Sequence, residues 1–124
     1  MKKSLVLFLA VFAFSAAIIS SCKKDKKEDP KPTCVVDNMS FASDITPIMN
    51  TNCSTSGCHD NVTTAAGIRL DTFPNISENA DLIIKSIKHL AGAKPMPAPA
   101  GTDPLSDCDI SKFEAWVAQG KKNN

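Results

Sequence analysis

Two thiols and an imidazole occur within seven residues of the chain, at Cys53, Cys58 and His59. Four residues separate the two cysteines, and the histidine follows the second cysteine directly. Proteins use such a set of side chains in three ways: to attach a c-type haem, to coordinate zinc, or to form a disulfide. This segment is therefore the first candidate for the chemistry of the protein.

The three chemistries place different demands on the histidine. A c-type haem forms thioethers with two thiols and needs a histidine directly after the second cysteine to reach the iron. Zinc needs ligands that converge, whereas the adjacent side chains of Cys58 and His59 diverge. A disulfide between Cys53 and Cys58 uses no histidine. The adjacency favours haem, but the usual spacing is two residues rather than four, so disulfide and zinc stay open as alternatives.

Two stretches on either side of this segment are expected to form helices. Residues 40–52 repeat apolar side chains at helical spacing, and Ser40 or Ser43 can cap the helix that they predict. Pro47 is tolerable only if that helix is short and starts near Ser43. Residues 77–91 have a broad apolar face of leucine and isoleucine and predict a second helix. Residues 61–74 show no sustained period and predict a loop, with an extended stretch at its end.

The clearest helix signals lie near the end of the sequence. Ser106 is a predicted N-cap, and Asp109 occupies the third helical position, as in an acidic variant of the capping box. Gly120 predicts the end of this helix. Its expected inner stripe is Ile110, Phe113 and Val117, with Trp116 beside the stripe.

The N-terminus has the pattern of an export signal. Residues 1–21 begin with Met1 and two lysines, and 14 of the 16 residues from 4 to 19 are apolar and none is charged. This run is too short for a comfortable membrane span, and small residues precede Cys22, as in a bacterial lipobox. We expect a lipoprotein signal peptide over 1–21. Residues 22–32 are then the lipidated Cys22 and a disordered charged tether.

The folded domain is assigned to residues 33–122, and its apolar content is sparse. Only 23 of the 92 residues after position 32 are Val, Ile, Leu, Met, Phe or Trp. A short chain with a sparse core usually needs a disulfide, a metal or a cofactor. The same region carries 7 basic and 10 acidic residues, which argues against nucleic acid as a partner. Length and composition together argue against a large multi-domain enzyme and a membrane bundle.

Most of residues 40–120 resembles the monohaem c-type cytochromes, in the variety carried by exported bacterial lipoproteins. The four-residue gap between the cysteines departs from the usual motif, although it is known in some c-type cytochromes. The matching pieces come in the family's order and are Phe41–Met49, Ser56–His59, Gly67–Leu70, Pro95–Pro97 and the segment from Pro104 to Gly120.

The resemblance implies an all-α fold, a small class I cytochrome c-like bundle of three to four helices around one covalent haem c. In that family the cysteines of the motif form the thioethers, which are Cys53 and Cys58 here. The histidine after them, His59, is the proximal iron ligand. The distal ligand is a methionine in a proline-rich loop before the last helix, which corresponds to Met96.

Other residues compete for the distal position. His89 is the only other histidine, and ligation by His59 and His89 would lower the reduction potential relative to His/Met. Met39 and Met49 are expected to pack in or beside the first helix. Met96 lies within residues 93–101, where three prolines in nine residues should make a stiff, extended segment that presents one side chain. The candidates for neutralising haem propionates are Arg69 and Lys94.

Two cysteines remain after lipid and haem, at Cys34 and Cys108. In class I cytochromes the N- and C-terminal helices pack together, so the resemblance implies that a disulfide joins these two regions. An exported chain enters an oxidising compartment, where such a pair can form.

We therefore expect a one-electron carrier rather than an enzyme. It would be exported and lipid-anchored to a membrane, on the periplasmic side or at the cell surface. Its partners would be redox proteins of the cell envelope. The alternatives are a haem enzyme or gas sensor with a labile distal ligand, and a non-haem binding module stapled by disulfides.

Overall fold

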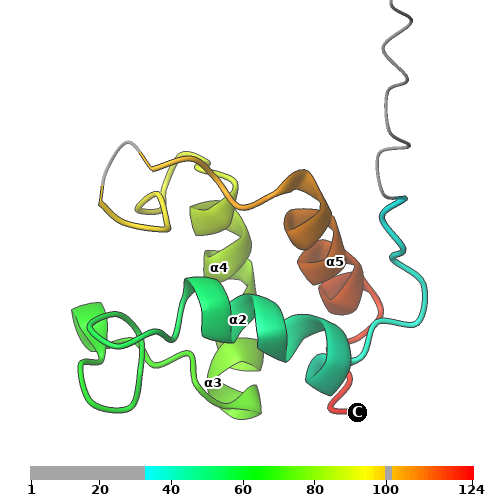
Figure 1. The fold of residues 1–124 in the computed structure, drawn as a ribbon, viewed down its shortest axis with the longest axis horizontal. Helices are drawn as coiled ribbons and strands as arrows, with labels where there is room; N and C mark the ends of the chain where they lie inside the picture. The colour runs from blue at the N-terminus through cyan, green and yellow to red at the C-terminus, as the bar shows by residue number, and fades with distance from the viewer. Residues whose placement is uncertain (1–32, 100–101) are drawn as a thin grey trace, which may run out of the picture. The chain divides into compact units, whose positions relative to one another are not determined.

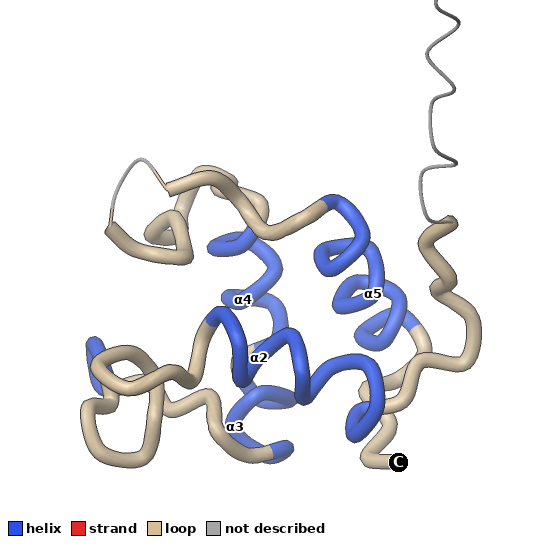
Figure 2. Tube along the Cα trace, viewed as in Figure 1, coloured by secondary structure: helices blue, strands red, loops and turns tan. Residues whose placement is uncertain are grey.

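A computed structural model describes residues 33–99 and 102–124. These residues form helices, turns and loops with no strand among them (Figure 2), so the all-α prediction is confirmed. No helix in the described ranges is both long and apolar enough to cross a membrane. The predicted signal peptide at 1–21, Cys22 and the tether to residue 32 lie outside them. The elements are η1 (Phe41–Ile45), α2 (Thr46–Asn52), η2 (Ala65–Gly67), α3 (Phe73–Glu78), α4 (Ala80–Ile87) and α5 (Asp107–Ala118).

The first helix begins earlier than expected, at Phe41 rather than near Ser43. The Ser40 hydroxyl caps it and accepts a hydrogen bond from the Ser43 N–H. Its first turn is a π-helix, in which both the backbone N–H and the hydroxyl of Thr46 donate to the Phe41 carbonyl. A proline ring clashes with the carbonyl four residues before it, and the wide π-turn relieves this restriction at Pro47. Of the two predicted caps, Ser40 is confirmed. The start near Ser43 was wrong because it assumed regular α-helical geometry around Pro47.

The helix predicted over residues 77–91 is two helices, α3 and α4, which meet at Asn79. The Asn79 side chain donates to the main-chain carbonyl of Asn75 at 2.8 Å, and such back-bonding competes with continuous helix. Helix α3 starts earlier than expected because Pro74 is well suited to a first helical turn. Helix α4 ends at Ile87, before His89, whose φ of +54° is incompatible with a right-handed helix.

The predicted start and end of the last helix agree with the structure. The Ser106 hydroxyl accepts from the Asp109 N–H at 3.1 Å and donates to the Asp109 carboxylate at 2.8 Å. Helix α5 ends just before Gly120, whose φ of +93° is the left-handed conformation that glycine adopts without strain. The Gly120 N–H donates to the Val117 carbonyl.

Trp116 lies at the centre of the core rather than beside the inner stripe of α5, which corrects the sequence prediction. Trp116 and Phe113 are both 0% exposed, and the rings of Phe41 and Phe73 surround the indole at centroid distances of 5.6 and 6.3 Å. The indole N–H donates to the Lys122 carbonyl, so its polar group is satisfied. This packing joins α5 to η1 and places α4 against α5 (Figure 1).

A disulfide joins Cys34, before η1, to Cys108, in the first turn of α5, as expected. Two hydrogen bonds fasten the same N-terminal segment at the other end of α5. The Gln119 side chain accepts from the Met39 N–H and donates to the Val36 carbonyl, both at 2.8 Å. The segment before η1 is therefore joined to the start of α5 by a disulfide and to the end of α5 by two hydrogen bonds.

We predict that replacing both cysteines, C34S and C108S together, lowers the free energy of unfolding. The bond closes a loop spanning 74 residues, and in the chain-entropy treatment such a closure contributes about 4 kcal/mol. Urea unfolding of the two proteins under identical conditions measures the difference. A difference below about 1 kcal/mol would contradict a substantial role for this bond, since most native disulfides contribute more.

Candidate functional site

A cavity of about 490 Å³ lies between the loop after α2 and the proline-rich loop after α4. Figure 1 shows both loops at the same side of the helices. The cavity is lined by all four residues predicted to hold a cofactor, Cys53, Cys58, His59 and Met96. Its volume is within the usual range for cofactor sites. The apolar part of its wall comes from Ile68, Leu70, Leu82, Ile83 and Ile87.

The segment from Cys53 to His59 is a closed turn. The His59 N–H donates to the Cys53 carbonyl at 3.1 Å, and the Cys58 N–H donates to the Thr55 carbonyl at 3.0 Å. Gly57 has a φ of +85°, where a side chain would be strained. The four residues between the cysteines therefore form a compact bend, and both thiols and the imidazole line the same cavity.

The His59 ring is fixed in one orientation. Its Nδ1 lies 2.9 Å from the Ile68 carbonyl oxygen, so Nδ1 carries the proton and donates it. The residue is 8% exposed, and no buried side-chain nitrogen or oxygen of the described residues lacks a hydrogen-bond partner. Nε2 has no hydrogen-bond partner in the described ranges. Since no buried nitrogen there lacks a partner, Nε2 must be accessible rather than fully buried. A backbone bond at one ring nitrogen with a free lone pair at the other is the arrangement of a metal-ligating histidine.

The two thiols of the motif are both free, so the alternative disulfide between Cys53 and Cys58 is not formed. Cys53 is buried at the end of α2 and Cys58 is exposed. Burial, with a smaller contribution from Cys58, raises the pKa of the Cys53 thiol to about 11. This thiol is protonated at neutral pH. In the described residues, no group of three or more His, Cys, Asp and Glu side chains has an arrangement that could hold a metal ion.

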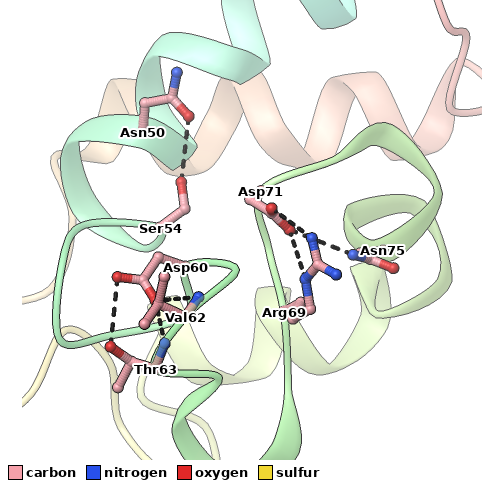
Figure 3. Close-up of polar contacts among 8 residues, drawn as sticks. All are labelled: Asn50, Ser54, Asp60, Val62, Thr63, Arg69, Asp71 and Asn75. Carbon is pink, nitrogen blue, oxygen red and sulfur yellow. Dashed lines mark hydrogen bonds and ion pairs between the residues drawn. The ribbon is translucent and has the colours of Figure 1, made fainter.

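Asp60 organises the loop that follows His59, a role that the sequence analysis did not assign (Figure 3). Its carboxylate accepts from the main-chain N–H groups of Thr63 and Val62. It also accepts from the main-chain N–H group of Gly57. These bonds, that of Thr63 above all, lower the pKa of the carboxyl group below its ordinary value. An aspartate in a turn commonly accepts a hydrogen bond from the main-chain N–H two residues later, in an Asx turn. The place of Asp60, directly before the predicted loop, is the signal that could have identified this role.

The structure separates Met96 from its rivals. Met96 is half-buried and lines the cavity, and its N–H donates to the Ser86 carbonyl at 3.1 Å. His89 is not among the residues that line the cavity, and its Nε2 lies 3.1 Å from the Met96 carbonyl oxygen. Met39 and Met49 are buried in the core at 4% and 1% exposure, as expected.

The proline-rich segment is irregular, as predicted, but it bends over residues 96–99 instead of remaining extended. Of the two charged candidates for a propionate, Lys94 lines the cavity. Arg69 does not line it and pairs with Asp71 at 2.7 Å, in a contact that also includes Asn75 (Figure 3).

Comparisons of the chain with protein-family models, with curated proteins and with solved structures find no match. The described residues form an all-α fold. The resemblance to c-type cytochromes is carried by the motifs of the sequence alone, and Cys53, Cys58, His59 and Met96 of those motifs line the cavity.

We predict that Asp60→Ala lowers the midpoint of thermal unfolding at pH 7, and that the difference disappears in acid. The folded-state pKa of Asp60 lies below its ordinary value. The stabilisation is therefore complete above about pH 4 and is lost as the pH falls through the folded-state pKa. Melting curves from pH 7 down to the acid limit of folding measure this change.

Asp103→Ala is the matched control, because Asp103 is an exposed carboxylate without a hydrogen bond in the described residues. A loss at Asp60 that is equal to the loss at Asp103, or that does not change with pH, would contradict the assigned role.

Proposed function

We propose that this protein is a c-type cytochrome that carries one electron at a time, with one haem bound covalently through Cys53 and Cys58. His59 is the proximal iron ligand and Met96 the distal ligand. The observation that supports the proposal most strongly is the shared cavity. His59 and Met96 stand 37 positions apart in the sequence, on different loops, and they line one 490 Å³ cavity with both thiols of the motif.

The chemistry of these residues fits a covalently bound haem. Two free thiols are the groups required for the thioethers, and the orientation of the His59 ring leaves Nε2 as a neutral donor for iron. The Met96 thioether is a soft neutral donor that favours ferrous over ferric iron. The leucine and isoleucine side chains of the wall would provide an apolar environment for the bound group. A bound haem would supply the reversible one-electron chemistry of its iron.

Two ligands from the chain favour electron transfer over catalysis. If His59 and Met96 both bound the iron, no coordination position would remain for a substrate. This would distinguish a carrier from a haem enzyme or gas sensor. The class I cytochrome c-like bundle is the fold that we propose with this function. The contact between η1 and α5 agrees with the packing of N- and C-terminal helices in that fold.

The cellular setting belongs to the same proposal. The pattern of residues 1–21 and Cys22 supports export and lipid anchoring. The Cys34–Cys108 disulfide agrees with an oxidising compartment. The redox partners would be proteins of the cell envelope.

The residues of the motif make separable contributions to haem binding. We predict that C53S and C58S each reduce the amount of haem that stays with the polypeptide after denaturation, because each removes one thioether. H59A should keep some covalent haem at most and should lose the low-spin spectrum, because it removes an axial ligand. Haem staining of denaturing gels and absorbance spectra measure the two effects. Wild-type haem content and spectra in all three variants would contradict the assignment.

Met96 determines which kind of haem protein this is. We predict that M96A keeps covalent haem, loses any thioether–ferric charge-transfer band and lowers the reduction potential. The ferrous form of the variant should bind carbon monoxide, whereas the wild type should not. The matched control is M49A, which removes a methionine from the core instead of the cavity. A six-coordinate, low-spin M96A protein that rejects carbon monoxide would overturn the role of Met96.

A further inference from the structure

Two hydrogen bonds fix the main chain on either side of the Met96 side chain. The Met96 N–H donates to the Ser86 carbonyl, in the last turn of α4, at 3.1 Å. The Met96 carbonyl oxygen lies 3.1 Å from the Nε2 atom of His89. Because a carbonyl only accepts, Nε2 carries a proton and donates it. Both bonds connect the proline-rich loop to the C-terminal end of α4.

The backbone of His89 is adapted to this contact. Its φ of +54° is a left-handed conformation, which histidine, asparagine and glycine adopt more readily than most residues do. The Leu90 N–H turns back to the Lys85 carbonyl at 2.9 Å and closes the helix end around His89. The side chain is half-buried and reaches seven residues along the chain to Met96.

We infer that His89 is a positioning residue for Met96: its ring fixes the main chain of the proline-rich loop so that the thioether stays in the cavity. The inference rests on the proposed function, in which Met96 is the distal ligand. A flexible loop would have to be ordered each time the thioether bound, and a loop already fastened at both sides of Met96 avoids that cost. His89 thus favours ligation by Met96 without entering the cavity.

Three substitutions at position 89 separate the side-chain hydrogen bond from the backbone conformation. H89N and H89G both tolerate positive φ but cannot reach the Met96 carbonyl. H89Q is less suited to positive φ, but its side-chain amide nitrogen lies the same number of bonds from Cα as Nε2 and can donate. M96A is the reference for an opened site.

The first readout is the binding of imidazole to the ferric haem-loaded protein, followed by absorbance. Imidazole competes with the distal ligand, so weaker positioning gives tighter imidazole binding. We expect H89N and H89G to bind imidazole roughly three- to tenfold more tightly than the wild type, the equivalent of one ordinary hydrogen bond. H89Q should be closer to the wild type despite its strained backbone. The second readout is hydrogen exchange at the Met96 amide, which should accelerate in H89N and H89G.

The outcomes distinguish this inference from the proposed function. If M96A opens the site while H89N and H89G bind imidazole as the wild type does, the positioning role is overturned and the function stands. Equal effects of H89Q, H89N and H89G would also overturn it, since the donor would then be irrelevant. If M96A stays closed and H89N opens the site, His89 is the distal ligand. The positioning role of His89 and the ligation by Met96 are then both wrong.

Discussion

The site depends on the hydrogen bond between His59 Nδ1 and the Ile68 carbonyl, at 2.9 Å. This bond selects the tautomer of the ring and leaves Nε2 as the free donor. The loop after His59 must fold back for Ile68 to reach the ring, and the bond from the Leu70 N–H to the His59 carbonyl at 2.9 Å maintains that fold. The carboxylate of Asp60 supports the intervening turn. The conformation of most of the loop therefore fixes the orientation of one imidazole.

The helices carry the two loops that form the site. The core around Trp116 fixes α5 against η1 and α4, while the Cys34–Cys108 disulfide holds the N-terminal segment to α5. Helix α2 ends at Cys53 and α4 leads into the loop that carries Met96. A small apolar core thus supports both loops that line the cavity. The small size of this core agrees with the sparse apolar content of the chain.

Local signals predicted the features that depend on a few neighbouring residues. The Ser106 cap is of this kind, as is the end of α5 just before Gly120. The π-turn at Phe41 and the break at Asn79 were missed, because both replace regular helix with side-chain bonds that no periodicity records. The bond from His89 to Met96 was also missed, since it depends on a left-handed residue and on the fold of a distant loop. The Cys34–Cys108 pair was predicted only through the resemblance to cytochromes.

The proposed function depends above all on the covalent attachment of one haem through Cys53 and Cys58. The most direct measurement is the mass of the purified wild-type protein under denaturing conditions, after production in a host that attaches haem c, followed by sequencing of the peptide that contains residues 53–59. We expect a mass increase of one haem, with the added mass on that peptide alone. An unmodified peptide, or one whose only change is a bond between its two cysteines, would contradict covalent attachment of haem.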